Sequence, residues 1–211
     1  MKNIFPPVEM ADKDGLLGYG GELSVRYLEN AYRHGIFPWP QEGLPVLWFA
    51  PPKRGILEFS NFHIPSRFLR EVKSKGWEFK INHDFQSVIC ECARQKRKRQ
   101  KGTWILPEMI FAYTDFHEAG FAHSFEVYEK DRLIGGLYGV WIHHYFAGES
   151  MFHLESGASK FALIKTVEFL ENKGLTWMDT QMVTPLIKSF GGREVSRDIF
   201  MKKLNRSLSN D

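Results

Sequence analysis

The chain has 211 residues, of which 43% are hydrophobic and 25% charged, the balance of a globular protein with an apolar core. This composition excludes a disordered tail, a collagen-like repeat and a small disulfide-rich protein. The net charge is only +3, and no stretch approaches the ~18 apolar residues of a membrane span. Because the N-terminus also lacks a signal-peptide pattern, we expect a cytoplasmic protein.

The first part of the chain, residues 1–57, is rich in proline, glycine and aromatic side chains. It contains one clear helix pattern. Ser24 is a favourable N-cap, apolar residues recur at helical spacing from Val25 to Tyr32, and Gly35 follows as a terminator. We therefore predict a small N-terminal domain over residues 1–57.

The remainder, residues 58–211, alternates between helical and strand patterns. Apolar residues recur every three to four positions in the helical segments and every second position in the strands. We predict helices over 65–75, 85–92, 109–116, 158–172 and 195–204, and strands over 77–81, 123–128, 133–146 and 175–179. The expected architecture is α+β, with a mixed sheet and helices packed on its faces.

The positive charge is concentrated in one short segment, residues 94–101, which contains no acid. The rest of the chain has 22 basic and 25 acidic side chains. Most such segments are solvated loops, but a basic patch near aromatic residues is also typical of RNA-binding proteins. The candidate RNA-binding residues are Arg94, Lys96, Arg97, Lys98, Arg99 and Lys101.

Metal-binding patterns are not found in the sequence. Cys90 and Cys92 are two positions apart, too close for an ordinary disulfide and too few for a zinc site. The eight histidines are scattered, and His143 and His144 would alternate across the predicted strand. We therefore expect reduced cysteines and no metal ion.

Polar residues near two predicted strand ends are the first candidates for chemistry. Glu149 follows one strand end, and Asp179 and Gln181 close another. Residues two apart in a strand share one side, so Asp179 and Gln181 can act together. The alternative is that Asp179 caps the next turn and Gln181 is a surface amide. Trp39 and Trp104 could equally anchor the hydrophobic core or stack against a ligand.

Nine motifs together resemble the leucyl/phenylalanyl-tRNA–protein transferase family. They cover nearly the whole chain in the family's order, and their combination is far more specific than any one of them. The motifs are GLLGYGGELS (15–24), AYRHGIFPW (31–39), LWFAP (47–51), GTWI (102–105), GFAHS (120–124), GGLYG (135–139), FAGESMF (146–152), ASK (158–160) and DTQ (179–181). The chain departs from the family at Pro185, at 190–192 and at Ser196, and its basic segment is longer than typical.

The resemblance implies an enzyme that moves leucine, phenylalanine or, less readily, methionine from tRNA to the N-terminal arginine or lysine of acceptor proteins, which marks them for N-end-rule degradation. It implies an acetyltransferase-like fold of the GNAT type behind the small N-terminal domain, and we expect a monomer. The implied catalytic pair is Asp179 and Gln181. The implied substrate-binding residues are Trp39, Trp104, Phe146 and Glu149, with Tyr32 and Tyr113 nearby.

An aminoacyl-tRNA ester is already activated, so this reaction needs no ATP, metal or other cofactor. The acceptor amine must be neutral to attack, which calls for a carboxylate within reach, directly or through an amide. Asp179 and Gln181 meet this need as proton acceptor and amine positioner. Whether Asp179 takes the proton or only polarises Gln181 stays open, as does whether Glu149 holds the acceptor's or the donor's ammonium group.

Two other functions remain as alternatives. An acetyltransferase that uses coenzyme A would need an Arg/Gln-x-x-Gly-x-Gly/Ala loop, and the nearest match, residues 99–104, fails at its last position. A non-catalytic RNA-binding module would account for the basic segment. It would give no reason for Asp179 and Gln181.

Overall fold

The computed structural model describes residues 3–64, 68, 72, 75–95 and 103–209. Its N-terminal part contains a three-stranded antiparallel sheet in the order β1-β3-β2, which the sequence patterns did not predict. These strands have two to four residues, too few for an alternating pattern to be recognised. The elements of this part are η1 (Val8–Met10), β1 (Leu16–Tyr19), α1 (Val25–Arg33), β2 (Phe37–Pro38) and β3 (Leu47–Phe49).

The predicted first helix is confirmed as α1. The Ser24 hydroxyl accepts a hydrogen bond from the Tyr27 backbone N–H at 3.4 Å, which caps the first turn. Gly35 follows the helix with a φ of +73°, a conformation that favours glycine at a helix end. Leu28 and Tyr32 on the inward face are fully buried, so α1 is held by packing as well as by its cap.

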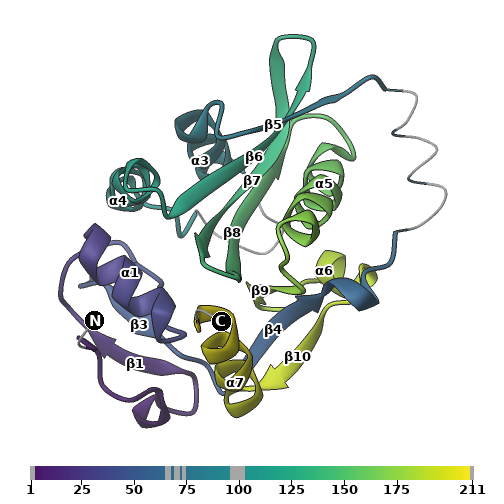
Figure 1. Cartoon of the computed structure of the whole chain (residues 1–211). Helices are drawn as coiled ribbons and strands as arrows, with labels where there is room; N and C mark the ends of the chain where they lie inside the picture. Colours follow the sequence, from purple (N-terminus) through teal and green to yellow (C-terminus); the bar gives the residue numbers. More distant parts are fainter. Residues whose placement is uncertain (1–2, 65–67, 69–71, 73–74, 96–102, 210–211) are drawn as a thin grey trace.

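The larger sheet has the order β10-β4-β9-β8-β7-β6-β5 among the described residues (Figure 1). Its neighbours pair antiparallel except for β8 and β9, which run parallel. The strands are β4 (Lys53–Glu58), β5 (Glu78–Ile81), β6 (Ala122–Glu129), β7 (Arg132–Ile142), β8 (Tyr145–His153), β9 (Trp177–Gln181) and β10 (Arg193–Ser196).

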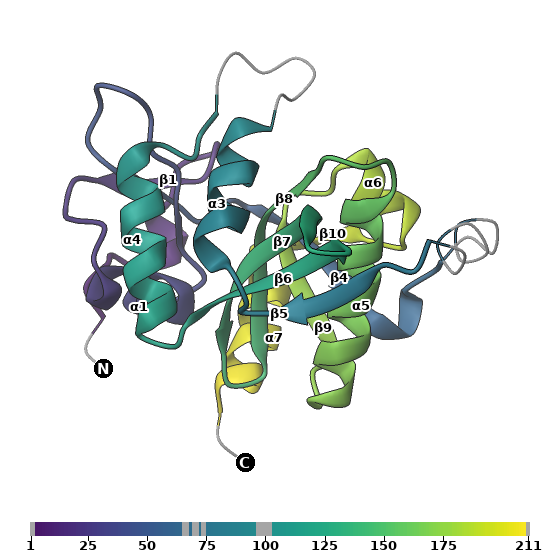
Figure 2. The same ribbon diagram turned by 90° about the horizontal axis from the view of Figure 1, so that it is seen from above.

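Helices cover both faces of this sheet, as Figure 2 shows from above. Helix α5 packs on one face against β6, β7 and β8, and α3 and α4 pack on the other. Helix α1 contacts α4, which joins the N-terminal part to that second face. The helices are η2 (Phe59–Asn61), α3 (Phe85–Arg94), α4 (Pro107–Glu118), α5 (Ala158–Asn172), α6 (Pro185–Ser189) and α7 (Arg197–Leu208).

The structure confirms the predicted α+β architecture and also corrects part of it. The strand predicted over 133–146 was wrong, because it is two strands, β7 and β8, joined by a turn at His143 and His144. His143 has a φ of +52°, so these two histidines turn the chain and do not alternate across a strand. Strands β4 and β10 and helix α6 were not predicted. The helix predicted over 195–204 begins later, as α7 at Arg197, and the helix predicted over 65–75 lies largely outside the described residues.

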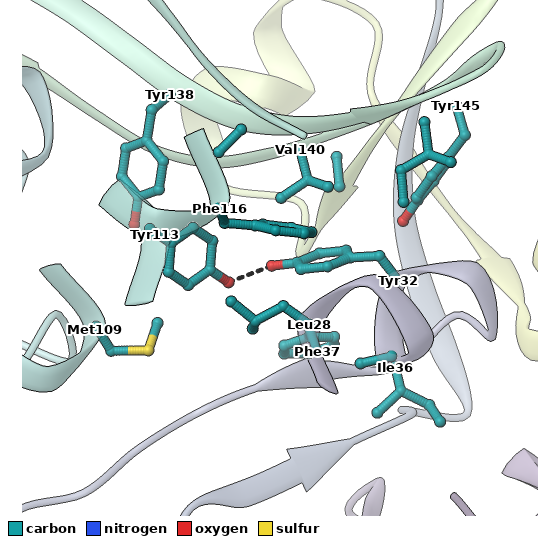
Figure 3. Close-up of a cluster of buried hydrophobic side chains, with 14 of the residues drawn as sticks. Leu28, Tyr32, Ile36, Phe37, Met109, Tyr113, Phe116, Tyr138, Val140 and Tyr145 are labelled. Atoms are coloured by element: carbon teal, nitrogen blue, oxygen red, sulfur yellow. Dashed lines mark hydrogen bonds between the residues drawn. The ribbon is translucent and has the colours of Figure 1, made fainter. Parts of the chain in front are cut away.

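The domain division at residue 57 stays a prediction. Strand β4, which spans the predicted boundary, pairs with β9 and β10 in the larger sheet. One cluster of buried apolar side chains also continues from the N-terminal part into the second face of that sheet (Figure 3). The two predicted domains therefore share a core.

Gly139 on β7 allows an unusually close approach of β8. A Cβ atom at this position would lie 2.4 Å from the carbonyl oxygen of Ala147 and 2.4 Å from the ring of Phe146. We expect Gly139→Ala to lower the free energy of unfolding by about 1–3 kcal/mol, the usual range for overpacking a core. Urea denaturation checks this, with Gly18→Ala as the control because a Cβ there meets nothing within 4 Å. Equal stability of the two variants would contradict the expectation.

Candidate active site

Two β-bulges place the candidate residues at the centre of the larger sheet. On β8, Gly148 and Ser150 pair with consecutive residues of β7, so Glu149 between them is the extra residue of a bulge. On β9, Asp179 and Gln181 pair with consecutive residues of β4, so Thr180 is a second bulge residue. Beside them, the parallel pairing of β8 with β9 is recorded at a single position, Ala147 with Asp179. Since bulges re-aim side chains, Glu149 and Gln181 can meet across the two strands.

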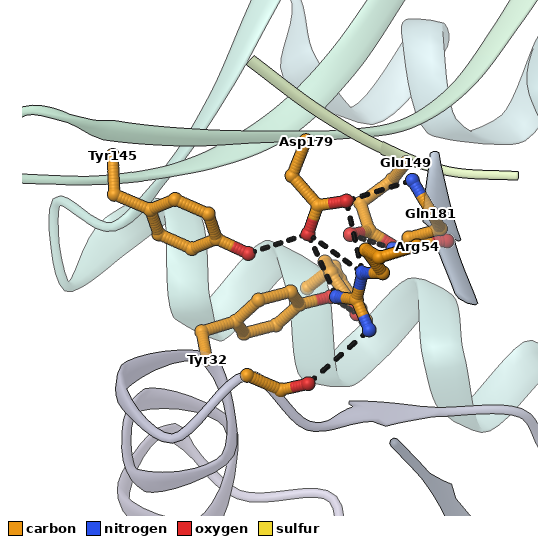
Figure 4. Close-up of polar contacts among 8 residues, drawn as sticks. Tyr32, Arg54, Tyr145, Glu149, Asp179 and Gln181 are labelled. Carbon is orange, nitrogen blue, oxygen red and sulfur yellow. Dashed lines mark hydrogen bonds and ion pairs between the residues drawn. The ribbon is translucent and has the colours of Figure 1, made fainter. Parts of the chain in front are cut away.

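Asp179 lies beside this meeting point in a buried ion pair with Arg54 of β4 (Figure 4). Arg54 Nε donates to the two carboxylate oxygens at 3.0 and 3.1 Å, and Nη2 donates to Oδ2 at 2.7 Å. Arg54 Nη1 also donates to the Gly35 carbonyl at 3.2 Å, and the guanidinium lies between the rings of Phe37 and Phe200. Burial opposes the charge, but Asp179 outweighs it and raises the pKa of Arg54 above its ordinary value.

The remaining acceptor positions of Asp179 are also used. The Tyr145 hydroxyl donates to Oδ2 at 2.7 Å, and the backbone N–H of Gln181 donates to Oδ1 at 2.8 Å. This second bond holds Gln181 in the left-handed region, with a φ of +57°, which is uncommon for a residue other than glycine. Asp179 therefore fixes the backbone that presents Gln181.

Glu149 is the second buried carboxylate of the site. The Gln181 amide Nε2 donates to Glu149 Oε1 at 2.7 Å. Burial raises the pKa of Glu149 to about 7, while hydrogen bonds from Tyr32 and Gln181 lower it by less. Glu149 is thus a carboxyl group that changes charge near neutral pH.

Two tyrosine hydroxyls lie within hydrogen-bond reach of Glu149. Tyr32 of α1 and Tyr113 of α4 hydrogen-bond to each other within the apolar cluster of Figure 3. Burial, together with the charge of Glu149, raises the pKa of each hydroxyl, so both stay protonated. The N-terminal part of the chain therefore contributes a polar group to the site.

A cavity of about 280 Å³ opens beside Glu149 and Gln181. Trp39 and Trp104 lie in its wall, with ring planes nearly parallel and centroids 5.2 Å apart. Most of the remaining wall is apolar and includes three methionine side chains, which adapt readily to different ligands. The apolar lining residues are Leu137, Met151, Leu163, Met178, Met182, Leu186 and Ile187.

Most predicted site residues lie together. Trp39, Trp104, Glu149 and Gln181 line the cavity, and Asp179, Tyr32 and Tyr113 hydrogen-bond to Gln181 or Glu149 without lining it. Phe146 is not a lining residue, because its buried ring packs against Phe125 in the core beneath α5. Its role in binding stays a prediction.

The structure describes one predicted RNA-binding residue, Arg94, whose exposed guanidinium pairs with Glu91 at 2.7 Å. The other five, Lys96 to Lys101, lie outside the described residues. Within the described chain no group of three or more His, Cys, Asp or Glu could hold a metal ion. No helix in the same part of the chain has the length and apolar character needed to cross a membrane.

Arg54 and Tyr145 were not predicted from the sequence, although both contact Asp179. Arg54 stands next to a short apolar run, Gly55 to Leu57, which is typical of a buried strand. A charged residue beside such a run indicates a buried arginine, and a buried arginine requires an acidic partner. Tyr145 gave no comparable signal, since an aromatic residue in a strand is ordinary.

Comparisons with known proteins identify the family of the chain. The model of the leucyl/phenylalanyl-tRNA protein transferase family matches residues 56–205, and that of its N-terminal domain matches 21–52. A protein named leucyl/phenylalanyl-tRNA–protein transferase from Maridesulfovibrio salexigens is 45% identical over 98% of this chain and 87% of its own length. A protein of the same name from Lawsonia intracellularis is 44% identical over 97% of this chain and 90% of its own length.

Among solved structures, the crystal structure of FemX shares the fold at a TM-score of 0.51 and 10% identity. The match covers 80% of this chain and 66% of FemX. It confirms the predicted acetyltransferase-like fold class and carries no information on substrate. The family match rests on the sequence comparisons, which cover nearly the whole chain. The chain therefore belongs to the leucyl/phenylalanyl-tRNA–protein transferase family and is an aminoacyltransferase.

Proposed function

We propose that this enzyme transfers leucine, phenylalanine or, less readily, methionine from tRNA to the α-amine of an N-terminal arginine or lysine of an acceptor protein. The observation that carries the proposal is an apolar cavity with a buried acid–amide network at its edge. The choice of donors and acceptors follows the family. The product would enter N-end-rule degradation in the cytoplasm, and we propose that the enzyme acts as a monomer.

The cavity suits a bulky uncharged side chain. Seven of its lining residues are aliphatic or methionine, so the amino-acid side chain of the donor would replace water against an apolar surface. A missing methylene in such a pocket costs only about 1–3 kcal/mol, so a valyl donor should react slowly and not be excluded. The terminal adenine would stack on Trp39 or Trp104, which is worth about 1–3 kcal/mol.

The edge of the cavity suits the reacting amine. Gln181 donates its amide N–H to Glu149 at the cavity wall, and Asp179 accepts a hydrogen bond from the Gln181 backbone N–H. An amine placed against the ester carbonyl gains up to about 7–11 kcal/mol from positioning alone. These features support the proposal, because an already activated ester requires only a pocket for the side chain, a group that positions the amine and a proton acceptor.

The experiment is to incubate the protein with labelled Phe-tRNA and a peptide that begins with arginine. Label in the peptide supports the proposal, and an N-acetylated copy of the peptide is the control that must stay unlabelled. Acetylation that depends on acetyl coenzyme A would support the alternative acetyltransferase. Binding of tRNA without transfer would support a non-catalytic RNA-binding module.

The basic segment gives a separate prediction for tRNA binding. Neutralising Arg97, Lys98 and Arg99 should raise the KM for aminoacyl-tRNA and make it less sensitive to salt, because each phosphate that a basic side chain neutralises releases counterions. The slope of log KM against log salt should fall by up to about one unit for each phosphate that is no longer neutralised. An unchanged slope would remove this segment from the RNA-binding surface.

A further inference from the structure

The transfer must remove a proton from the attacking amine, and the site contains two buried carboxylates that could receive it. We infer that Glu149 is the proton acceptor and that Asp179, with Arg54, is a positioning residue. This inference rests on the proposed aminoacyl transfer and names the group that carries its proton. It differs from the expectation that Asp179 and Gln181 form the proton-accepting pair.

Asp179 is unsuited to take the proton because both of its carboxylate oxygens already accept hydrogen bonds. Its oxygens accept from Arg54, from the Tyr145 hydroxyl and from the backbone N–H of Gln181. Its side chain is fully buried, and the guanidinium opposite is enclosed by two aromatic rings. Protonating Asp179 would leave Arg54 as an uncompensated buried charge, which is strongly unfavourable.

Glu149 has the access that Asp179 lacks. Among the described residues that line the cavity, Glu149 is the one carboxylate. The Gln181 amide donates its N–H to Glu149 Oε1, so its own oxygen is the end left to accept an N–H of the acceptor amine. An amine held by that oxygen would lie next to the carboxylate. Gln181 therefore orients the amine, and Glu149 receives its proton.

The surroundings of Glu149 suit this role. The Tyr32 and Tyr113 hydroxyls hydrogen-bond to the carboxylate, do not line the cavity and stay protonated. Burial raises the pKa of Glu149 to about 7, so at neutral pH the group can both accept and return a proton. An ordinary exposed glutamate, with a pKa of about 4.3, would be a much weaker base.

The proposed step balances without a cofactor. The amine nitrogen attacks the ester carbonyl carbon and forms the N–C bond, while one amine proton passes to Glu149. The bond from that carbon to the ribose oxygen then breaks, and Glu149 returns the proton to the leaving oxygen, which becomes a hydroxyl. Glu149 ends the cycle ionised, as it began.

The test is the pH dependence of kcat for Phe transfer to an Arg-initiated peptide, at saturating concentrations of both substrates. In the wild type we expect kcat to fall as the pH drops through about 7, because Glu149 must be ionised to accept the proton. Glu149→Gln should lower kcat by about 10²-fold or more and abolish this transition. Tyr32→Phe should move the transition to higher pH, because the hydrogen bond from Tyr32 lowers the pKa of Glu149.

Two controls separate this role from a structural one. Glu126→Gln alters another fully buried carboxylate of the same sheet, away from the cavity, and should leave the pH profile unchanged. An acceptor whose α-amine has a lower pKa should also leave the wild-type transition in place. The inference is overturned if Glu149→Gln keeps the wild-type profile or more than a tenth of kcat, or if the transition follows the amine. No transfer by the wild-type protein would instead refute the proposed function.

Discussion

Replacing Arg54 by methionine is expected to lower the free energy of unfolding by about 3–5 kcal/mol. The substitution keeps much of the side-chain volume but leaves the Asp179 carboxylate buried without its counter-charge. Removing one partner of a buried ion pair costs this much because the other charge has already lost its hydration. Urea denaturation at neutral pH measures the loss.

The double variant Arg54→Met/Asp179→Asn is the matched control. Asparagine keeps an oxygen that can accept from Gln181 or Tyr145, and no unpaired charge is left in the core. We expect this variant to regain most of the stability that Arg54→Met loses, because neutral replacements for a buried pair are often well tolerated. If the double variant is as unstable as the single one, the stability comes from the shape of Arg54 and not from its charge.

The second large effect is on catalysis. Asp179→Ala should lower kcat for aminoacyl transfer by about 10²-fold or more, because a shift of about 1 Å in a positioned group can cost this much. The backbone N–H of Gln181 loses its acceptor in this variant, so the bulge at Thr180 no longer holds the amide in place. The affinity for aminoacyl-tRNA should change by less than about threefold, since Asp179 does not line the cavity.

The same double variant distinguishes a positioning role of Asp179 from a role as the base. Arg54→Met/Asp179→Asn keeps an acceptor for the Gln181 N–H, so its kcat should exceed that of Asp179→Ala by about tenfold or more. If Asp179 were the base, asparagine would be as inactive as alanine. Loss of tRNA affinity without loss of kcat would assign Asp179 to substrate binding.

Several parts of the fold can be predicted from local sequence patterns. Helix α5 runs from Ala158 to Asn172, the range that its apolar spacing predicts, and α1 begins after the cap at Ser24. These features depend on residues within a few turns of one another, so a single segment contains the whole signal. The order of the family motifs also lies entirely in the sequence, which is why the family could be named from it.

Other parts depend on pairing between segments far apart in the chain. The sequence pattern predicts that Glu149 follows a strand end, whereas Glu149 is a bulge residue within β8. That bulge arises from how β8 meets β7, and the one at Thr180 from how β9 meets β4. A one-residue change in register redirects every side chain beyond it, and no local pattern contains this information.

The sequence by itself determined the candidate set: an acidic residue in one segment, an acid and an amide in another, and aromatic residues elsewhere. Only the tertiary structure decided their roles. It paired Arg54 with Asp179, 125 residues apart, and brought Tyr32 and Tyr113 together beside Glu149. Whether a carboxylate can take a proton depends on its burial and on the donors around it, and those donors come from segments that meet only in the folded chain.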